Sequence, residues 1–211
     1  QNKKYDRYDC LSESLACVLN GMEVCNFQKK NTIAIIGAGY MGLLFVCVAK
    51  IMKARYISVI DFSSKRLKIA KKLGANYIFN PKKISENKIQ KNILKPTKNL
   101  GYDVVISANG NLKSHNLACK LASKMGVVNL FGGIPKNKVG GLKIDSNLLH
   151  YKQIKITGSF SSNKKHLKKA FNIIKNKSID FSKIVTSYAN YDNFKEKIIS
   201  LKKKNEIKCI F

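Results

Sequence analysis

Short apolar runs alternate with longer amphipathic stretches over most of the chain. The run Thr32–Ile36 is continuously apolar, which is typical of a parallel strand covered on both faces. The next stretch, Tyr40–Lys53, carries Leu43, Cys47 and Ile51 on one helical stripe. The same alternation predicts further strands and helices, in chain order, at Tyr56–Asp61, Ser64–Leu73, Tyr77–Phe79, Tyr102–Ser107, Leu112–Lys124, Val127–Phe131 and Ile154–Gly158.

Strands that alternate with helices of about ten residues indicate β-α-β units and right-handed crossovers. We therefore expect an α/β fold with a doubly wound, six-stranded parallel sheet. A helix over Leu11–Val18, with Ser12 as its N-cap and its end near Gly21, precedes this sheet. A helix with an apolar stripe and three shorter elements follow it, at Leu167–Ile174, Ile184–Tyr188, Phe194–Leu201 and Ile207–Phe211. The outer segments resemble flanking pieces of an incomplete second domain, with expected divisions at 1–31, 32–180 and 181–211.

The charge balance is strongly basic. Lys and Arg total 40 against 12 Asp and Glu, a formal net charge of +28, while 45% of the residues are hydrophobic. That apolar share excludes a disordered tail. Only Arg7, Arg55 and Arg66 are arginines. Because nucleic-acid readers depend on arginine for bidentate contacts, we expect no specific nucleic-acid partner and attribute the lysines to coding bias.

The cysteines and the apolar segments bear on location. No two of the six cysteines are spaced C-x-x-C, and we expect reduced thiols in a cytoplasmic protein. Thr32–Ala49 is uncharged and long enough to imitate a membrane span. The glycines at 37, 39 and 42 favour a strand, a turn and a helix instead, so we expect no membrane partner.

A G-x-G-x-x-G pattern, Gly37 to Gly42, lies between the first predicted strand and its helix. In this context it is typical of a Rossmann-type dinucleotide-binding turn. Gly37 permits the tight turn, Gly39 lets a pyrophosphate approach the helix N-terminus, and Gly42 allows close helix packing. The alternative is a glycine-rich turn that only closes the fold.

Asp61 ends the second strand, where this fold places an acidic residue that accepts hydrogen bonds from the adenosine ribose. Its charge favours NAD over NADP, although Arg66 lies close enough in sequence to weaken that preference. The alternative is that Asp61 caps the helix near Ser64. Small residues at or after the other strand ends leave room for a nicotinamide, unless they only form turns: Ala108, Phe131, Gly132, Gly133, Ser159 and Phe160.

Together, these residues resemble the zinc-dependent medium-chain dehydrogenases, and two segments are similar to the polyol branch with sorbitol (L-iditol) and threonine dehydrogenases. The similarity covers roughly nine-tenths of the chain. The residues that carry it are Glu13–Cys17, Ile33–Gly42, Asp61, Arg66, Phe131–Lys136 and Asn147–Lys152.

The resemblance implies a complete enzyme that uses zinc to move a hydride from a secondary alcohol or polyol to NAD. Glu13 matches the family's acidic residue beside the zinc. Edge-strand pairing in a homodimer would involve Val127–Lys152. The residues implied to bind NAD are Gly37, Gly39, Tyr40, Met41, Gly42, Asp61 and Arg66, with the nicotinamide near Phe131, Gly132, Ser159 and Phe160.

The sequence also departs from the family pattern. The part of the family that holds the Cys and His zinc ligands has no counterpart here, and Ser14 replaces a proline. His115, His150 and His166 lack ligand spacing. We expect His150 to be a structural or interface histidine and His166 to be solvated. We therefore expect no catalytic residue in this chain. Three hypotheses follow: the cofactor-binding portion of a dehydrogenase, an inactive NAD-binding remnant, or a basic nucleic-acid-associated protein.

Overall fold

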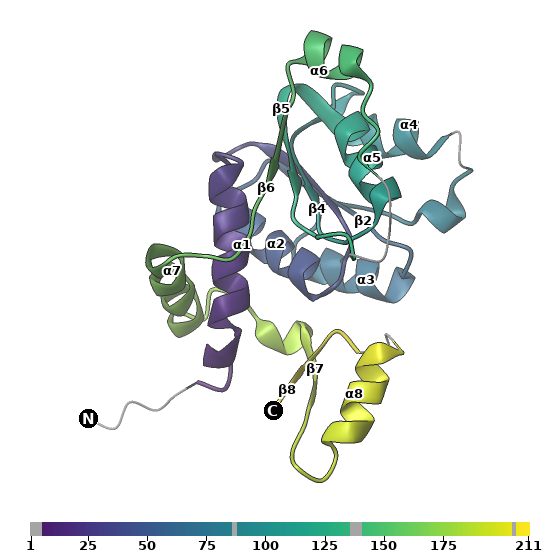
Figure 1. Ribbon diagram of the computed structural model, residues 1–211. Helices are drawn as coiled ribbons and strands as arrows, with labels where there is room; N and C mark the ends of the chain where they lie inside the picture. The colour runs from purple at the N-terminus through teal and green to yellow at the C-terminus, as the bar shows by residue number, and fades with distance from the viewer. Residues whose placement is uncertain (1–5, 86–87, 136–140, 204–205) are drawn as a thin grey trace.

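The computed structural model describes residues 6–85, 88–135, 141–203 and 206–211. Its main sheet has six strands in the order β3-β2-β1-β4-β5-β6, and every neighbouring pair is parallel (Figure 1). The strands are β1 (Thr32–Ile36), β2 (Tyr56–Ile60), β3 (Tyr77–Phe79), β4 (Tyr102–Ser107), β5 (Ala122–Leu130) and β6 (Lys155–Gly158). The order reverses between β1 and β4, so the predicted doubly wound sheet is confirmed.

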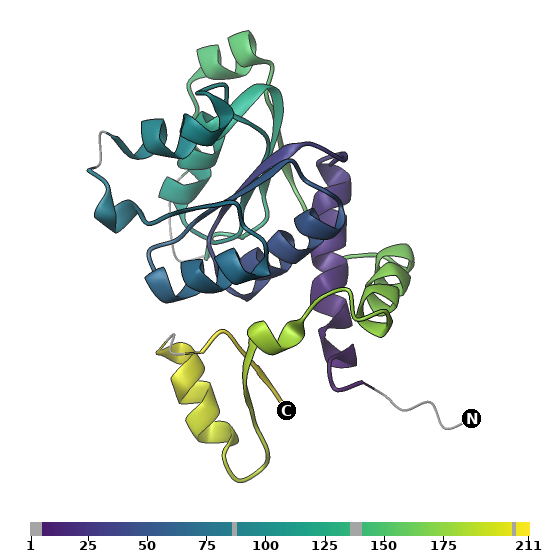
Figure 2. The same cartoon turned by 180° about the vertical axis from the view of Figure 1, so that it is seen from behind.

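Both faces of the sheet are covered by helices, which explains why the central strand β1 is buried along its whole length. In β1, Ile33 and Ile35 join the hydrophobic core on one face, whereas Ala34 and Ile36 join the core on the other. Figure 2 shows the helical layers from behind. One layer contains α1 (Ser12–Val24), α2 (Tyr40–Ile51), α3 (Ser64–Leu73) and α7 (Lys164–Lys175); the other contains α4 (Ile89–Leu94), α5 (Leu112–Leu121) and α6 (Ser146–Lys152).

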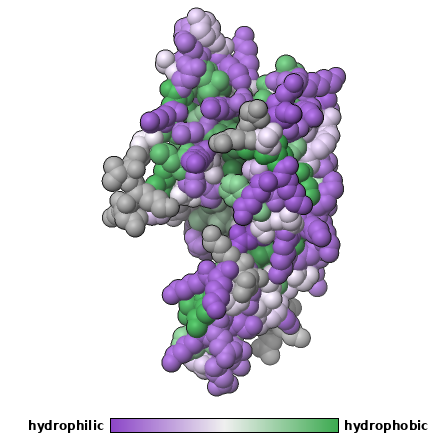
Figure 3. Space-filling view, turned by 90° about the vertical axis from the view of Figure 1, so that its right-hand side faces the viewer, coloured by the Kyte–Doolittle hydropathy of each residue, from purple (hydrophilic) through white to green (hydrophobic). Residues whose placement is uncertain are grey.

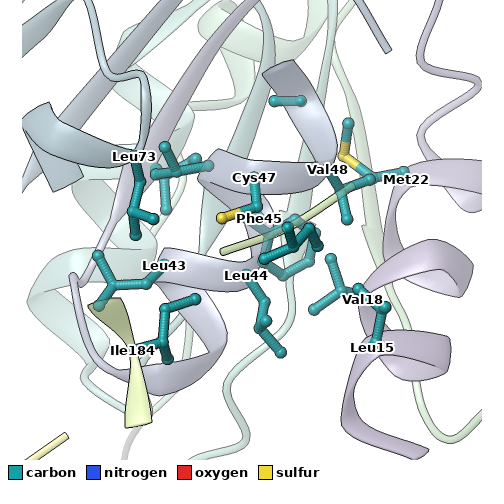
Figure 4. Packing of buried hydrophobic residues seen from close by; sticks show 14 of the residues in the cluster. Leu15, Val18, Met22, Leu43, Leu44, Phe45, Cys47, Val48, Leu73 and Ile184 are labelled. Carbon is teal, nitrogen blue, oxygen red and sulfur yellow. The ribbon is translucent and has the colours of Figure 1, made fainter. Parts of the chain in front are cut away.

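The first helix differs from the prediction at both ends. Leu11 is its N-cap residue and makes no side-chain capping hydrogen bond, so Ser12 is not the cap. The helix continues through Gly21 to Val24. A Cβ on Gly21 would lie 2.8 Å from Cζ of Phe45, which means that this glycine serves close packing rather than helix termination. Figure 4 shows α1 side chains, among them Val18 and Met22, facing those of α2.

The region around β5 also differs from the prediction. Helix α5 ends at Leu121, and β5 begins at once with Ala122 instead of Val127. The early part of β5 pairs Ala122 with Tyr102, after which the register shifts. The strand ends at Leu130, so Phe131 lies just after it and not within it. Helix α6, over residues for which no helix was predicted, begins with the Asp145 side chain accepting a hydrogen bond from the Asn147 N–H.

The C-terminal residues form a separate small sheet. Strands β7 (Val185–Tyr188) and β8 (Lys208–Ile210) pair in parallel and are connected by α8 (Phe194–Lys202), below the main sheet in Figure 1. Lys208 Nζ lies 4.9 Å from the ring centroid of Tyr40, so this unit touches the first turn of α2. The divisions at 1–31, 32–180 and 181–211 stay predictions.

The surface is mostly polar, in keeping with the charge. Figure 3 shows hydrophilic side chains over most of one face, with apolar patches between them. Within the described ranges, no helix is long and apolar enough to cross a membrane. The uncharged stretch Thr32–Ala49 forms β1, the glycine turn and most of α2, which confirms its interpretation as strand, turn and helix.

Candidate functional site

The glycine turn connects the carboxyl end of β1 to α2. Gly37 has φ +107°, which a side chain would strain, and its N–H donates to Ile60 O at 2.8 Å. A Cβ on Gly42 would lie only 1.8 Å from Gly37 O, so the helix packs directly on the turn. Gly39 is the N-cap residue of α2, and a Cβ there would meet nothing within 4 Å. The turn thus leaves open space above the free N–H groups of the helix.

Asp61 fastens the end of β2 to this turn. Its carboxylate accepts hydrogen bonds from Ala38 N at 2.8 Å and from Ser63 N at 2.7 Å. Ser63, not Asp61, is the N-cap of α3, where its hydroxyl accepts from Arg66 N at 3.4 Å. The capping alternative for Asp61 is therefore wrong. Each carboxylate oxygen has one of these bonds and can accept a second.

The ends of β4 and β5 meet beside the glycine turn. Ala108 N and Asn109 Nδ2 both donate to Ile36 O, at 2.9 and 3.2 Å. Gly132 N donates to Ser107 O at 2.9 Å, and a Cβ on Gly132 would lie 2.3 Å from the carbonyl carbon of Asn109. Gly133 has open space where its Cβ would be. Backbone hydrogen bonds from Ala108 and Gly132 therefore hold the ends of β1, β4 and β5 together.

Two residues that the sequence analysis did not place in the site support these strand ends. Asn109 bridges β4 to β1, as above, and the buried His115 of α5 lies with Nε2 3.1 Å from Asn109 O and 3.0 Å from Gly132 O. Since both partners are carbonyls, Nε2 carries the proton. The available signal was weak: an Asn one residue past a strand end, and a histidine within an otherwise regular helix.

The end of β6 lies against α1. The Ser159 hydroxyl pairs with the side chain of Asn129, and Asn20 of α1 donates to the carbonyls of Phe160 and Ser161. Phe160 is 96% exposed. Phe131, by contrast, is packed edge-to-face on Phe45 at 4.9 Å between ring centroids.

Three further predicted residues line the start of α2 and α3. Tyr40 is the first residue of α2, and burial raises the pKa of its phenol to about 12. Met41 packs against the core beneath the turn. Arg66 lies half-buried in the first turn of α3.

Glu13 lies in the first turn of α1 and accepts hydrogen bonds from Cys17 Sγ at 3.1 Å and from Ser14 Oγ at 3.4 Å. Burial, then the bond to Glu13, raises the pKa of the Cys17 thiol to about 11. In the part of the chain that the structure describes, no group of three or more His, Cys, Asp or Glu side chains could hold a metal ion. The described residues therefore do not fit a zinc site.

The histidines outside the strand ends divide into two cases. His150 is exposed, and its ring stacks edge-to-face on Tyr151 with centroids 4.8 Å apart. His166 is 3% exposed, so the expectation that it is solvated is wrong. Its Nδ1 accepts from Asn163 N in a capping box, and its Nε2 lies 2.9 Å from Glu23 of α1. Lys136, the last residue of one motif, lies outside the described residues.

Comparison with known proteins gives consistent results. The zinc-binding dehydrogenase family matches residues 41–176. The chain is 29% identical over 202 residues to D-arabitol-phosphate dehydrogenase of Enterococcus avium, covering 95% of this chain and 56% of that protein. It is 29% identical over 195 residues to L-threonine 3-dehydrogenase of Thermococcus kodakarensis, covering 90% of this chain and 53% of that protein. The chain thus spans about half the length of these relatives.

Solved structures share the fold. An alcohol dehydrogenase from Thermotoga maritima superposes with a TM-score of 0.88 at 23% identity, over 100% of this chain and 58% of that one. The 2R,3R-butanediol dehydrogenase of Bacillus subtilis gives a TM-score of 0.87 at 22% identity, over 99% of this chain and 58% of that one. At these identities the likeness concerns architecture alone.

Proposed function

The chain belongs to the zinc-binding dehydrogenase family and corresponds to its cofactor-binding portion, and from this premise we propose that it binds NAD at the carboxyl edge of its main sheet. The observation that carries the proposal is the contrast within the glycine turn. At Gly42 the backbone of Gly37 occupies the place of a Cβ, whereas at Gly39 the place of a Cβ is empty. A turn that only closed the fold would not require glycine at position 39, because a side chain there would collide with nothing.

The pyrophosphate would lie over Gly39. The first N–H groups of α2 have no partner within the helix, and together with the helix dipole they favour a negative charge at this end. Met41 and Gly42 belong to the same first turn. Gly37 and Asp61 hold the backbone of the turn in place from below, through the bonds to Ile60 and Ala38.

The adenosine ribose would bond to Asp61. Its carboxylate is fixed by two backbone N–H groups and retains acceptor capacity for ribose hydroxyls. A 2′-phosphate at the same place would be repelled by the carboxylate, which favours NAD over NADP. Arg66, five positions after Asp61, carries a positive charge that opposes this preference. The balance between the carboxylate and the guanidinium is therefore the quantity to measure.

The nicotinamide end would extend along the strand ends of β4, β5 and β6. This edge presents small or open residues at Ala108, Gly132 and Gly133, and the residues Phe131, Ser159 and Phe160 border it. Glu13, on α1, would approach the reacting end in a longer enzyme. Since the described residues do not fit zinc, we derive no step through a metal here.

For a complete enzyme containing this portion, we propose oxidation of a secondary alcohol or polyol. Bound NAD⁺ would accept the hydride of the carbinol carbon while the hydroxyl proton is released to water, which gives a ketone and NADH. This chain's residues would contribute binding and orientation: the glycine turn and Asp61 fix the adenosine half, and the strand ends of β4 to β6 border the reactive ring.

The test is a fluorescence titration of the full chain with NADH and, separately, NADPH. We expect saturable binding that favours NADH, and Asp61→Ala to raise the Kd for NADH by roughly tenfold or more, because a hydrogen bond to a charged group is lost. Asp192→Ala is the matched control. It removes the same charge from an exposed loop residue outside the proposed site.

Two further measurements, salt dependence and activity in a joined enzyme, separate the other two hypotheses. If NADH and NADPH bind equally and their affinity rises steadily as salt is lowered, the +28 charge accounts for the binding and the proposed site is wrong. An inactive remnant would bind NADH as proposed and still fail to oxidise alcohols when joined to the remaining portion of a related enzyme.

A further inference from the structure

The segment after β6 is held by two asparagines from distant parts of the chain. Asn129 of β5 is fully buried, and its Nδ2 donates to Gly21 O at 3.0 Å. The Ser159 hydroxyl lies 3.1 Å from Nδ2 and 3.2 Å from Oδ1 of the same amide. Asn20 of α1 donates from Nδ2 to Ser161 O at 3.0 Å and, more weakly, to Phe160 O at 3.4 Å.

The asparagine in β5 is not explained by packing alone. It lies between apolar strand neighbours such as Val128, and an apolar side chain there would need no partner. The amide instead bonds to Gly21 O, in the last turn of α1. Gly21 makes this contact accessible, because a Cβ there would collide with Phe45 and hold α1 away from the sheet.

The segment they hold has an unusual combination of features. Ser161 is a non-glycine residue with φ +60°, in the left-handed region. Phe160 beside it exposes 96% of its surface, so its ring contributes little to the core. The backbone is therefore fixed on both sides of a large aromatic ring that has almost no packing of its own.

We propose that Asn20 and Asn129 are positioning residues that fix the Ser159–Ser161 segment for the nicotinamide half of the cofactor. The inference rests on the proposed function. A segment that is already ordered loses less entropy when a ligand binds to it. The adenosine half would bind at β1 and β2, which lie across β4 and β5 from this segment in the sheet order. Loosening the segment thus weakens only one half of the contact with the cofactor.

Two ligands distinguish the halves. NADH contains both, whereas ADP-ribose lacks the nicotinamide ring. The full chain and its Asn20→Ala and Asn129→Leu variants are titrated with each ligand, by NADH fluorescence and by calorimetry for ADP-ribose. We expect the Kd for NADH to rise about fivefold in each variant, as for one net hydrogen bond, with that for ADP-ribose unchanged.

Controls separate positioning from general damage. Asn172→Ala changes an exposed asparagine of α7 and leaves both affinities unchanged. Asn20→Gln keeps the amide and recovers part of the NADH affinity. The blue shift of bound NADH emission, which reports the surroundings of the ring, is reduced in Asn20→Ala at an unchanged melting temperature.

The outcomes are distinct. If both ligands weaken equally, or neither does, the asparagines are structural only and the inference is overturned. If Asn129→Leu does not fold, the variants of the half-buried Asn20 decide the question alone. If the unaltered chain binds neither NADH nor ADP-ribose, the proposed function itself fails and the inference falls with it.

Discussion

Replacing Gly42 with alanine tests how closely α2 packs on the glycine turn. The added Cβ would lie 1.8 Å from Gly37 O and 2.9 Å from Gly37 C, both of which are backbone atoms. No side chain can rotate to make room, so the helix or the turn must move by more than an ångström. In a helix without this contact, the same change would stabilise the protein by up to about 1 kcal/mol.

The magnitude follows from opposing the two effects. Forcing extra volume into a packed site costs about 1–3 kcal/mol, more where the obstacle is rigid. We therefore expect Gly42→Ala to lower the free energy of unfolding by about 1–2 kcal/mol after the helix gain is subtracted. Gly39→Ala is the matched control, since its Cβ meets nothing within 4 Å and its φ of −71° suits alanine. Loss of the glycine N-cap destabilises the fold, and the smaller entropy of the unfolded chain with alanine stabilises it. Each effect is worth about 0.5–1 kcal/mol, so they nearly cancel.

Urea unfolding followed by far-ultraviolet circular dichroism measures the change in stability of both variants, and NADH titration measures their cofactor affinity. We expect Gly39→Ala to unfold like the unaltered chain but to lose NADH affinity, because its methyl group would occupy the proposed pyrophosphate position. A Gly42→Ala variant that is as stable as the unaltered chain would refute the close packing. Undiminished NADH binding by Gly39→Ala would refute the pyrophosphate placement.

Two further predictions concern stability. The bond to His166 and the charge of Lys165 lower the pKa of Glu23, so the Glu23 carboxylate stabilises the fold above a pH of about 4.5, and this effect is lost as the pH falls through the lowered pKa. We expect Glu23→Gln to flatten this acid dependence in urea unfolding measured from neutral to acid pH. An unchanged slope would contradict the pairing. Tyr102→Phe removes a buried hydroxyl that bonds to Ser58 Oγ at 2.8 Å and Ile93 O at 2.7 Å. We expect the free energy of unfolding, measured in urea, to fall by about 1–3 kcal/mol at an unchanged m-value. A loss near zero would mean that water replaces the hydroxyl.

The sheet was predictable because its signal is local. In β1, alternate residues face two different hydrophobic layers, and a strand buried on both faces gives a continuous run such as Thr32–Ile36. The glycine turn was also predictable, since its spacing between a strand and a helix is a local pattern. The roles of Gly39 and Gly42 as open and crowded positions agree with that pattern.

The errors arose where distant residues decide the local structure. Gly21 resembles a helix end in sequence, yet α1 continues through it because Phe45 of α2 requires the close approach. His166 resembles a solvated residue on a lysine-rich helix, but Glu23, 143 positions away, gives it a buried partner. No pattern within a single segment contains the information about such a partner.

The support of the strand ends was missed for the same reason. Asn109 and His115 contribute through carbonyls of β1 and of the loop after β5, which only the folded sheet brings to them. The NAD-contacting roles of the individual residues, and the preference for NAD over NADP, stay predictions. The family membership and the cofactor-binding portion rest on the comparisons as well as on the turn.

The pairing of α1 with α7 has a consequence for the time course of folding. The bond from Asn20 to Ser161 closes a loop of 141 positions, and the Glu23–His166 pair closes one of 143. Contacts of such high sequence separation form slowly, because the entropy of closing the loop must be lost before they are gained. On a ribosome, α1 would leave the exit tunnel long before α7 exists. The β6 end of the sheet's carboxyl edge would thus be completed only after the glycine turn is already in place.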